Sequence, residues 1–142
     1  MAKEPIFYTH CTEMEVPFFD VDALQIAWHG HYIKYFEVAR CAMLASLGYT
    51  YYDMKDDGFM WPIVDMRVKY MRPARFGQMI NIHCDLVEYE NRLKINYRVE
   101  DALTGERLTK GYTIQLAVDL NTQEACFVTP ERWQSKIKAV MV

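Results

Sequence analysis

The chain has 142 residues and a formal net charge of −3, with 51% apolar and 25% charged residues. This length is usual for one domain with its own core, and the composition argues against a disordered, collagen-like or coiled-coil protein. The small negative charge provides no general field that would attract nucleic acid, so an anionic ligand would need a local basic cluster.

The four cysteines stand far apart, at positions 11, 41, 84 and 126. They form no C-x-x-C pair and no Cys/His set at zinc-ligand spacing, so we expect free thiols in a reducing compartment. No phosphate-cradling glycine loop, dinucleotide fingerprint or metal motif is present, and no bound cofactor is expected. The start, MAKEPIFYTH, has no apolar stretch of signal-peptide length, and no window suits a membrane span, so we expect a cytoplasmic protein.

The first half of the chain predicts a strand, a loop and a long helix. Residues 12–18 alternate polar and apolar side chains, as in a strand with one buried face. After a loop over residues 20–30, apolar side chains recur three or four apart until Gly48, which predicts a helix that packs closely on a sheet. Its buried face is expected to contain Tyr32, Phe36, Ala39, Met43 and Leu47. A short helical turn is predicted over residues 49–57.

The second half is rich in β-formers. Strands are predicted over residues 60–70, 79–88, 92–101 and 107–120, and the short turns between them favour antiparallel pairing. The segment LKINYRVE alternates apolar and polar residues, which predicts one dry and one wetter sheet face. A last helix is predicted over residues 130–138, with Thr129 as its cap and proline at its first position.

This order of elements predicts one α+β domain over residues 1–142, in which a twisted antiparallel β-sheet wraps around one central α-helix. One sheet and one helix leave sheet edges and the opposite sheet face uncovered. We therefore expect two or more subunits to associate, as a homodimer or homotetramer.

Functional groups are concentrated just before the long helix, at Asp20, Asp22, Trp28, His29 and His31. Backbone N–H groups at a helix start are unpaired and favour developing negative charge, and a nearby carboxylate can attack or activate water. The same residues also fit a simpler interpretation, in which the aspartates order the loop and His31 caps the helix. The residues alone leave both interpretations open.

The stretch FFDVDALQIAWHGHYIKYFEVARCAML resembles the start of the 4-hydroxybenzoyl-CoA thioesterase family, whose pattern is roughly D-x-D-x-x-G-x-V-x-H/Y-x-x-Y followed by an E-x-A-R helix. VKYMRPARFGQMINI is also similar to that family, so the resemblance runs from about residue 9 to residue 133. Bacterial acyl-CoA thioesterases associated with the Tol-Pal system are particularly similar. The resemblance implies the hotdog fold, which agrees with the predicted elements, and hydrolysis of an acyl thioester to free acid and CoA.

The resemblance also implies roles for single residues. Asp22, the second aspartate of the motif, would be the catalytic nucleophile or the general base, with the thioester carbonyl polarised at the helix N-terminus. His29 would bond the thioester oxygen or orient Asp22. Tyr32 matches the motif tyrosine, although a buried aromatic of the helix face is the simpler explanation, and Trp28 is one of several aromatic residues expected near the acyl group.

Gln25 departs from the pattern, because the family usually has glycine there. Glutamine tolerates a positive φ poorly, so we expect either a different loop path or a hydrogen bond from Gln25 to water or substrate.

Four basic residues are expected to contact the phosphates of CoA, although exposed cations on turns are more often solvated. They are Lys69, Arg72 and Arg75 in one turn and Arg92 in the next hairpin. Glu37 and Arg40, three residues apart, are expected to form an ion pair on the helix.

Two alternatives to an acyl-CoA thioesterase stay open. In one, the acyl group is carried by acyl carrier protein, and the basic turn meets an acidic protein. In the other, the loop with Gln25 no longer supports hydrolysis, and the protein binds acyl-CoA without turnover. The sequence does not indicate which acyl group is used.

Overall fold

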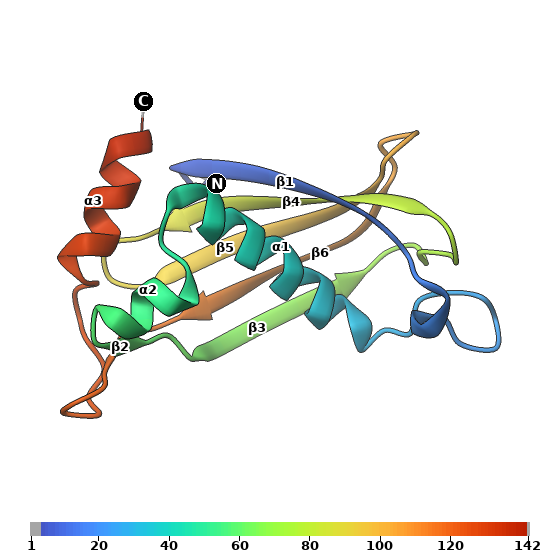
Figure 1. Cartoon of the computed structure of the whole chain (residues 1–142). Helices are drawn as coiled ribbons and strands as arrows, with labels where there is room; N and C mark the ends of the chain where they lie inside the picture. Colours follow the sequence, from blue (N-terminus) through green and yellow to red (C-terminus); the bar gives the residue numbers. More distant parts are fainter. Residues whose placement is uncertain (1–3, 142) are drawn as a thin grey trace.

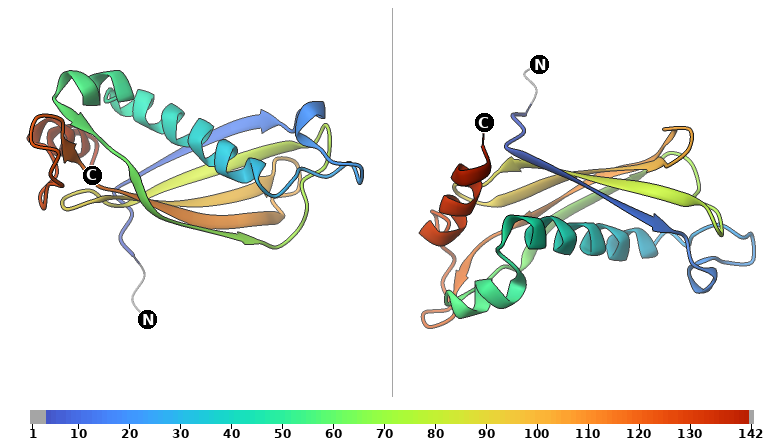
Figure 2. Two further views of the ribbon diagram at one scale, coloured as in Figure 1. Left: turned by 90° about the horizontal axis from the view of Figure 1, so that it is seen from below. Right: turned by 45° about the horizontal axis from the view of Figure 1, so that its top comes forward.

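The computed structural model describes residues 4–141. Five strands form one antiparallel sheet in the order β1-β4-β5-β6-β3, and two short strands, β2 and β7, pair separately. One long helix, α1, lies across one face of the five-stranded sheet (Figures 1 and 2). The strands are β1 (Tyr8–Glu15), β2 (Phe59–Met60), β3 (Ile63–Tyr70), β4 (Met79–Glu88), β5 (Leu93–Asp101), β6 (Arg107–Gln115) and β7 (Val118–Asp119). The helices are η1 (Phe18–Asp20), α1 (His31–Leu47), α2 (Tyr51–Asp56) and α3 (Glu131–Val140).

The predicted α+β architecture, with a twisted antiparallel sheet around one helix, is confirmed. Helix α1 begins and ends where its periodicity predicts, and Gly48 takes the left-handed conformation, with φ of +74°, that a C-cap glycine permits. The five residues predicted for its inner face are all buried. They pack on the apolar residues that alternate along β4 and β5, so the core lies between α1 and the sheet.

Helix α1 and the sheet approach closely at Gly111 of β6. A Cβ atom there would lie 3.0 Å from a ring carbon of Phe36 and would overlap the carbonyl oxygen of Arg67. Phe36 in turn stacks on Tyr97, with ring centroids 4.3 Å apart. The absent side chain therefore lets the aromatic face of α1 seat directly on the sheet.

Several predicted boundaries were wrong. The first strand runs from Tyr8 to Glu15 rather than over residues 12–18, because Pro17, which has no N–H to donate, precedes the turn of η1. The stretches over residues 60–70 and 107–120 are each broken into a short strand and a long one. In the last helix Pro130 is the N-cap, and the hydroxyl of Thr129 donates to the carbonyl oxygen of Tyr89 instead of capping.

Residues 4–141 lack two kinds of special feature. None of the described helices is long and apolar enough to cross a membrane. Within the same residues, no group of three or more His, Cys, Asp or Glu side chains is arranged to hold a metal ion. The four cysteines have free thiols in this part of the chain.

Candidate active site

The loop before α1 is a narrow hairpin fixed by backbone hydrogen bonds. Asp22 N–H donates to the carbonyl of Ile26 over 3.0 Å, and Trp28 N–H donates to the carbonyl of Asp20 over 3.0 Å. The hairpin then docks on the turn between β3 and β4, where Ala27 N–H donates to the carbonyl of Ala74 over 2.7 Å. The loop is therefore held at one end of the sheet, at the N-terminus of α1 (Figure 1).

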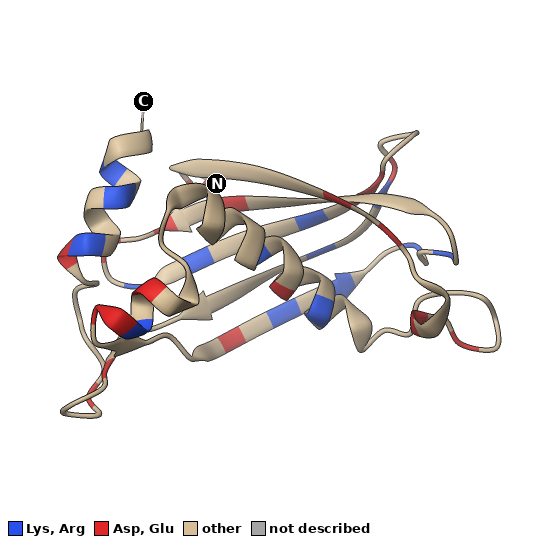
Figure 3. Cartoon of the chain, in the orientation of Figure 1, with Lys and Arg blue, Asp and Glu red and all other residues tan. Residues whose placement is uncertain are grey.

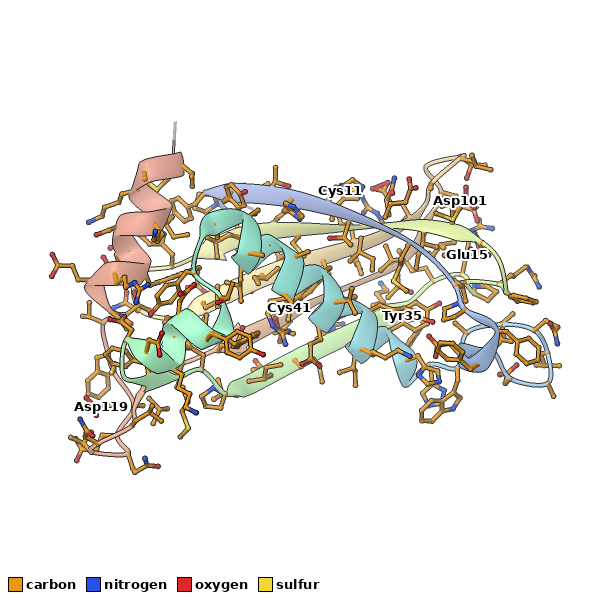
Figure 4. The ribbon with its side chains drawn as sticks, viewed as in Figure 1. Cys11, Glu15, Tyr35, Cys41, Asp101 and Asp119 are labelled. Atoms are coloured by element: carbon orange, nitrogen blue, oxygen red, sulfur yellow. The ribbon has the colours of Figure 1, made fainter. Side chains whose placement is uncertain are left out.

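The two aspartates of the loop have different environments. Asp20 is 1% exposed, and its carboxylate accepts hydrogen bonds from Lys34 Nζ at 2.6 Å and from the Tyr35 hydroxyl at 2.8 Å. Tyr35 lies on α1 near η1, so these bonds join the loop to the helix (Figure 4). Burial alone would raise the pKa of Asp20, but the hydrogen bonds from Lys34 and Tyr35 outweigh it and hold this pKa below its usual value. Asp20 is thus a structural anchor of the loop.

Asp22 is exposed, and one of its carboxylate oxygens accepts the N–H of Leu24 at 2.8 Å. This short-range bond is typical of an Asx turn and fixes the side chain relative to the loop. Within residues 4–141 its other oxygen, Oδ2, has no hydrogen-bond donor. Of the two aspartates, Asp22 therefore has the carboxylate that is accessible to a ligand.

The N-terminus of α1 presents unpaired backbone donors. Gly30 is its N-cap, and no side chain within the described part of the chain caps this end of the helix. The amide N–H groups of His29 and Gly30 also make no hydrogen bond to any residue in the range 4–141. The indole of Trp28, which is 49% exposed, lies so close to Gly30 that a Cβ atom there would overlap its ring. Glycine at position 30 therefore allows the indole to lie against the start of the helix.

Tyr70 is a site residue that the sequence analysis did not identify. Its hydroxyl donates to the carbonyl oxygen of His29 at 2.6 Å, and its ring centroid lies 6.1 Å from that of His29. The alternation of β3 could have placed Tyr70 on the helix side of the sheet with Val68, but it could not show that this end of β3 meets the loop. The structure thus brings β3 into contact with the start of α1.

Tyr32 lies in the core rather than at an open surface. It is 2% exposed, and its hydroxyl accepts the backbone N–H of Ala74 at 3.2 Å. This arrangement contradicts a direct substrate contact and supports the simpler interpretation of a buried aromatic, with the added role of fixing the turn that carries Arg72 and Arg75.

Gln25 has φ of +64°, a conformation that glycine adopts readily and glutamine poorly. The altered loop path stays a prediction. Its backbone is held on both sides, because its N–H donates to the carbonyl of Asp22 and its carbonyl accepts the N–H of Phe76. Whether the Gln25 side chain bonds water or substrate stays a prediction.

The four basic residues predicted to contact phosphate do not form one cluster in this chain. Arg72 and Arg75 line a cavity of about 420 Å³ beside the loop, and Arg72 is 3.6 Å from Glu106. Lys69 lines a different cavity, on the sheet face opposite α1. Arg92 lies in the β4–β5 turn at the other end of the sheet and pairs with Glu88 at 2.8 Å. Strand alternation and strand direction thus separate these residues within one protomer, and their contact with phosphate stays a prediction.

The expected ion pair between Glu37 and Arg40 is also wrong. Arg40 is 4% exposed and turns toward the sheet, where Nε donates to the hydroxyl of Tyr51 at 2.7 Å and Nη1 to that of Tyr97 at 3.3 Å. The three-residue spacing from Glu37 indicated an exposed pair. Arg40 instead lies on the buried face of α1, so its guanidinium is between the helix and the sheet.

Comparison with known proteins identifies the class. The sequence profile of the Thioesterase-like superfamily matches residues 16–139. The chain belongs to this superfamily. The "Putative acyl-CoA thioesterase YneP" of Bacillus subtilis is 29% identical over 108 residues, which cover 75% of this chain and 78% of that protein. The hotdog thioesterase predicted from the sequence is therefore confirmed as the class, and the chain is a thioester hydrolase by family; the narrower 4-hydroxybenzoyl-CoA group stays a prediction.

Solved structures agree with this assignment. The DHNA-CoA thioesterase of Staphylococcus aureus is 26% identical to this member of the superfamily, with a TM-score of 0.79 over 92% of this chain and 91% of the other. The 1,4-dihydroxy-2-naphthoyl-CoA thioesterase of Synechocystis is 19% identical, with a TM-score of 0.84 over 92% and 96% of the two chains, and supports the fold alone. The superfamily match therefore extends to the three-dimensional structure of nearly the whole chain.

Proposed function

We propose that the protein hydrolyses an acyl-CoA thioester to a free acid and CoA, at a site formed by Asp22 and the N-terminus of α1. The observation that carries this proposal is the combination of an accessible carboxylate at Asp22 with unpaired amides at His29 and Gly30. Backbone donors at a helix start are suited to stabilise the oxyanion that forms when a thioester carbonyl is attacked. The names of the relatives support CoA esters as the substrate class.

Two routes fit these groups. In the first, a carboxylate oxygen of Asp22 attacks the carbonyl carbon, the C–S bond breaks, and water hydrolyses the resulting anhydride. In the second, Asp22 takes a proton from water, which attacks the carbonyl and expels the CoA thiolate. A single turnover in H₂¹⁸O distinguishes them, because the anhydride route can place ¹⁸O in Asp22 itself, whereas the general-base route leaves the mass of the protein unchanged.

His29 and the basic turn have supporting roles in this proposal. The imidazole of His29, beside Trp28 and Tyr70, bonds the thioester oxygen or orients Asp22. Arg72 and Arg75 contact CoA phosphates from the cavity beside the loop, where arginine can offer paired donors. Arg92 could join them only from another protomer, so its role stays a prediction.

Association of subunits belongs to the same proposal. Strand β3 is an edge of the sheet and is exposed along most of its length, including the apolar residues Ile63, Val64 and Met66. Free strand edges with apolar side chains favour pairing with another chain. We propose a dimer through β3, on which a tetramer could be built, and one domain over the whole chain. Val64→Lys should shift the mass measured by light scattering toward the monomer, whereas an unchanged mass would exclude β3 as the interface.

A cytoplasmic location of the protein stays a prediction.

The test of the function is release of free CoA thiol from short aliphatic, long aliphatic and aromatic acyl-CoAs. Asp22→Asn should lower kcat/KM by about 10³-fold or more, because the nucleophile or base is lost. Asp56→Asn, at an exposed carboxylate of α2, is the matched control and should retain the wild-type rate. Full activity of Asp22→Asn would contradict the assignment. Turnover only when the acyl group is attached to acyl carrier protein would favour the carrier-protein alternative, and binding without turnover the non-catalytic one.

A further inference from the structure

The sheet face opposite α1 carries a row of cations that the proposed active site does not use. Lys69 of β3 pairs in register with Lys110 of β6, and Lys110 pairs with Arg98 of β5. Figure 3 shows basic residues along β3 and its neighbouring strands. Side chains directly opposite each other in antiparallel strands have Cβ atoms about 5 Å apart, so like charges there repel each other. A bound anion would remove this repulsion.

Most of these cations have no anionic partner. Arg98 is paired, with Asp85 at 3.2 Å and with Glu100 at 3.3 Å. Over residues 4–141, however, no carboxylate lies within 4.0 Å of the charged groups of Lys69, Lys110 or Arg67. Three positive charges on two adjacent strands are therefore uncompensated.

The uncompensated cations share a cavity of about 350 Å³, which is within the size range of sites for small molecules. Neutral hydrogen-bonding side chains from β5 and β6 also contribute to its wall. Its wall includes Arg67, Lys69, Asn96, Arg98, Lys110 and Tyr112, together with one carboxylate, Asp85, which pairs with Arg98. The combination of charge, neutral donors and an aromatic ring suits a phosphorylated ligand better than an apolar one.

The same sheet face holds carboxylates of this chain, among them Asp85, Glu100 and Glu4. Glu4 accepts hydrogen bonds from Lys94 at 2.9 Å and from the amide of Asn96 at 3.2 Å, and Asn96 is part of the cavity wall. The hydrogen bond from Lys94 lowers the pKa of Glu4. A side chain of the chain's own N-terminal segment thus occupies the margin of the cavity as an anion, which is independent support for an anion-binding surface.

We propose that this cavity binds the diphosphate group of a nucleotide. Neighbouring strands are about 4.8 Å apart, so Lys69 and Lys110 present two charges at a spacing that two linked phosphates can bridge, while the guanidinium of Arg67 offers paired donors. The site is separate from the cavity of Arg72 and Arg75, because Lys69 faces away from α1, whereas the next residue, Tyr70, faces toward it.

Calorimetric titration of the full chain with inorganic pyrophosphate and with ADP tests the proposal. The double variant Arg67→Gln/Lys110→Gln should bind both probes at least tenfold more weakly than the wild type. Lys55→Gln/Lys138→Gln is the matched control, because it removes the same charge from exposed positions of α2 and α3. Equal weakening in both variants would mean a general charge effect and would overturn the proposal, as would a wild type that fails to bind ADP at millimolar concentration.

Thermal unfolding provides a second measurement that does not depend on a ligand. The Tm of Arg67→Gln/Lys110→Gln should exceed that of the control variant. The substitution of Lys110 removes its repulsion with Lys69 and Arg98, which lie directly opposite it on the neighbouring strands. A Tm below that of the control would contradict the like-charge argument on which the site rests.

Competition with CoA identifies the source of the nucleotide. If saturating ADP weakens CoA binding to the wild type but not to Arg67→Gln/Lys110→Gln, the site holds the nucleotide end of CoA; if both bind the wild type independently, it holds a free nucleoside diphosphate. Equal weakening of CoA binding in the wild type and in this variant would place ADP at Arg72 and Arg75 and would overturn the proposal. None of these outcomes depends on hydrolysis, so failure of the proposed thioesterase activity would leave this test intact.

Discussion

The backbone N–H of Phe76 donates to the carbonyl oxygen of Gln25 over 3.1 Å, although Gln25 has φ of +64°. A residue with a side chain is therefore held in a conformation that normally favours glycine. Left-handed backbone costs a non-glycine residue roughly 1 to 2 kcal/mol, and such strain persists only where surrounding contacts fix it. The hydrogen bonds from the turn between β3 and β4 provide this constraint.

Gln25→Gly should change the free energy of unfolding by less than about 1 kcal/mol, in the stabilising direction. Relief of the positive φ favours the variant, while greater freedom of the unfolded chain offsets part of the gain. Gln25→Val should be destabilised, because a β-branched residue tolerates positive φ least well. Urea unfolding measures the free energy of unfolding of both variants. A Gln25→Gly variant less stable than Gln25→Ala would show that the greater freedom of the unfolded chain outweighs relief of the positive φ, which would contradict the prediction.

Removal of Asp20 should cost stability, whereas removal of Asp22 should not. Asp20→Ala leaves the buried hydroxyl of Tyr35 and one contact of Lys34 without an acceptor, which is expected to cost about 1 to 3 kcal/mol. Asp22→Asn keeps an oxygen for the N–H of Leu24 and should unfold at nearly the wild-type urea concentration. Similar losses in both variants would show that the two aspartates share one structural role.

The different roles of these aspartates could not be predicted from sequence. The D-x-D spacing indicated two candidate carboxylates, but which one is buried depends on η1, which begins where the predicted strand ended and was not itself predicted. Regular periodicity was more informative, because α1 and β4 have the predicted boundaries. Tyr70 and Arg72 show the limit of such patterns: their positions beside the loop depend on how β3 pairs with β6, and strand pairing is a long-range property that local alternation does not specify.

Asp20 should also make stability depend on pH. Because its pKa is lower in the folded protein than its ordinary value near 4, the unfolded chain binds the proton more tightly. The stabilisation from Asp20 is therefore fully present above about pH 5 and is lost as the pH falls through the folded-state pKa. The difference in unfolding free energy between wild type and Asp20→Asn, measured from pH 6 to pH 3, should decrease toward acid. A difference that stays constant over this range would show that the pKa of Asp20 is not lowered by folding.

Tyr51 should be more important for stability than Glu37, contrary to the ion pair that helix spacing indicated. The guanidinium of Arg40 is buried, and the hydroxyl of Tyr51 accepts its shortest hydrogen bond. Tyr51→Phe removes this acceptor from a buried charge and should cost about 1.5 to 3 kcal/mol. Glu37 is exposed and makes no contact with Arg40, so Glu37→Gln should change stability by less than about 0.5 kcal/mol. Urea unfolding measures the free energy of unfolding of both variants. A larger decrease for Glu37→Gln than for Tyr51→Phe would indicate that Arg40 pairs with Glu37 at the helix surface.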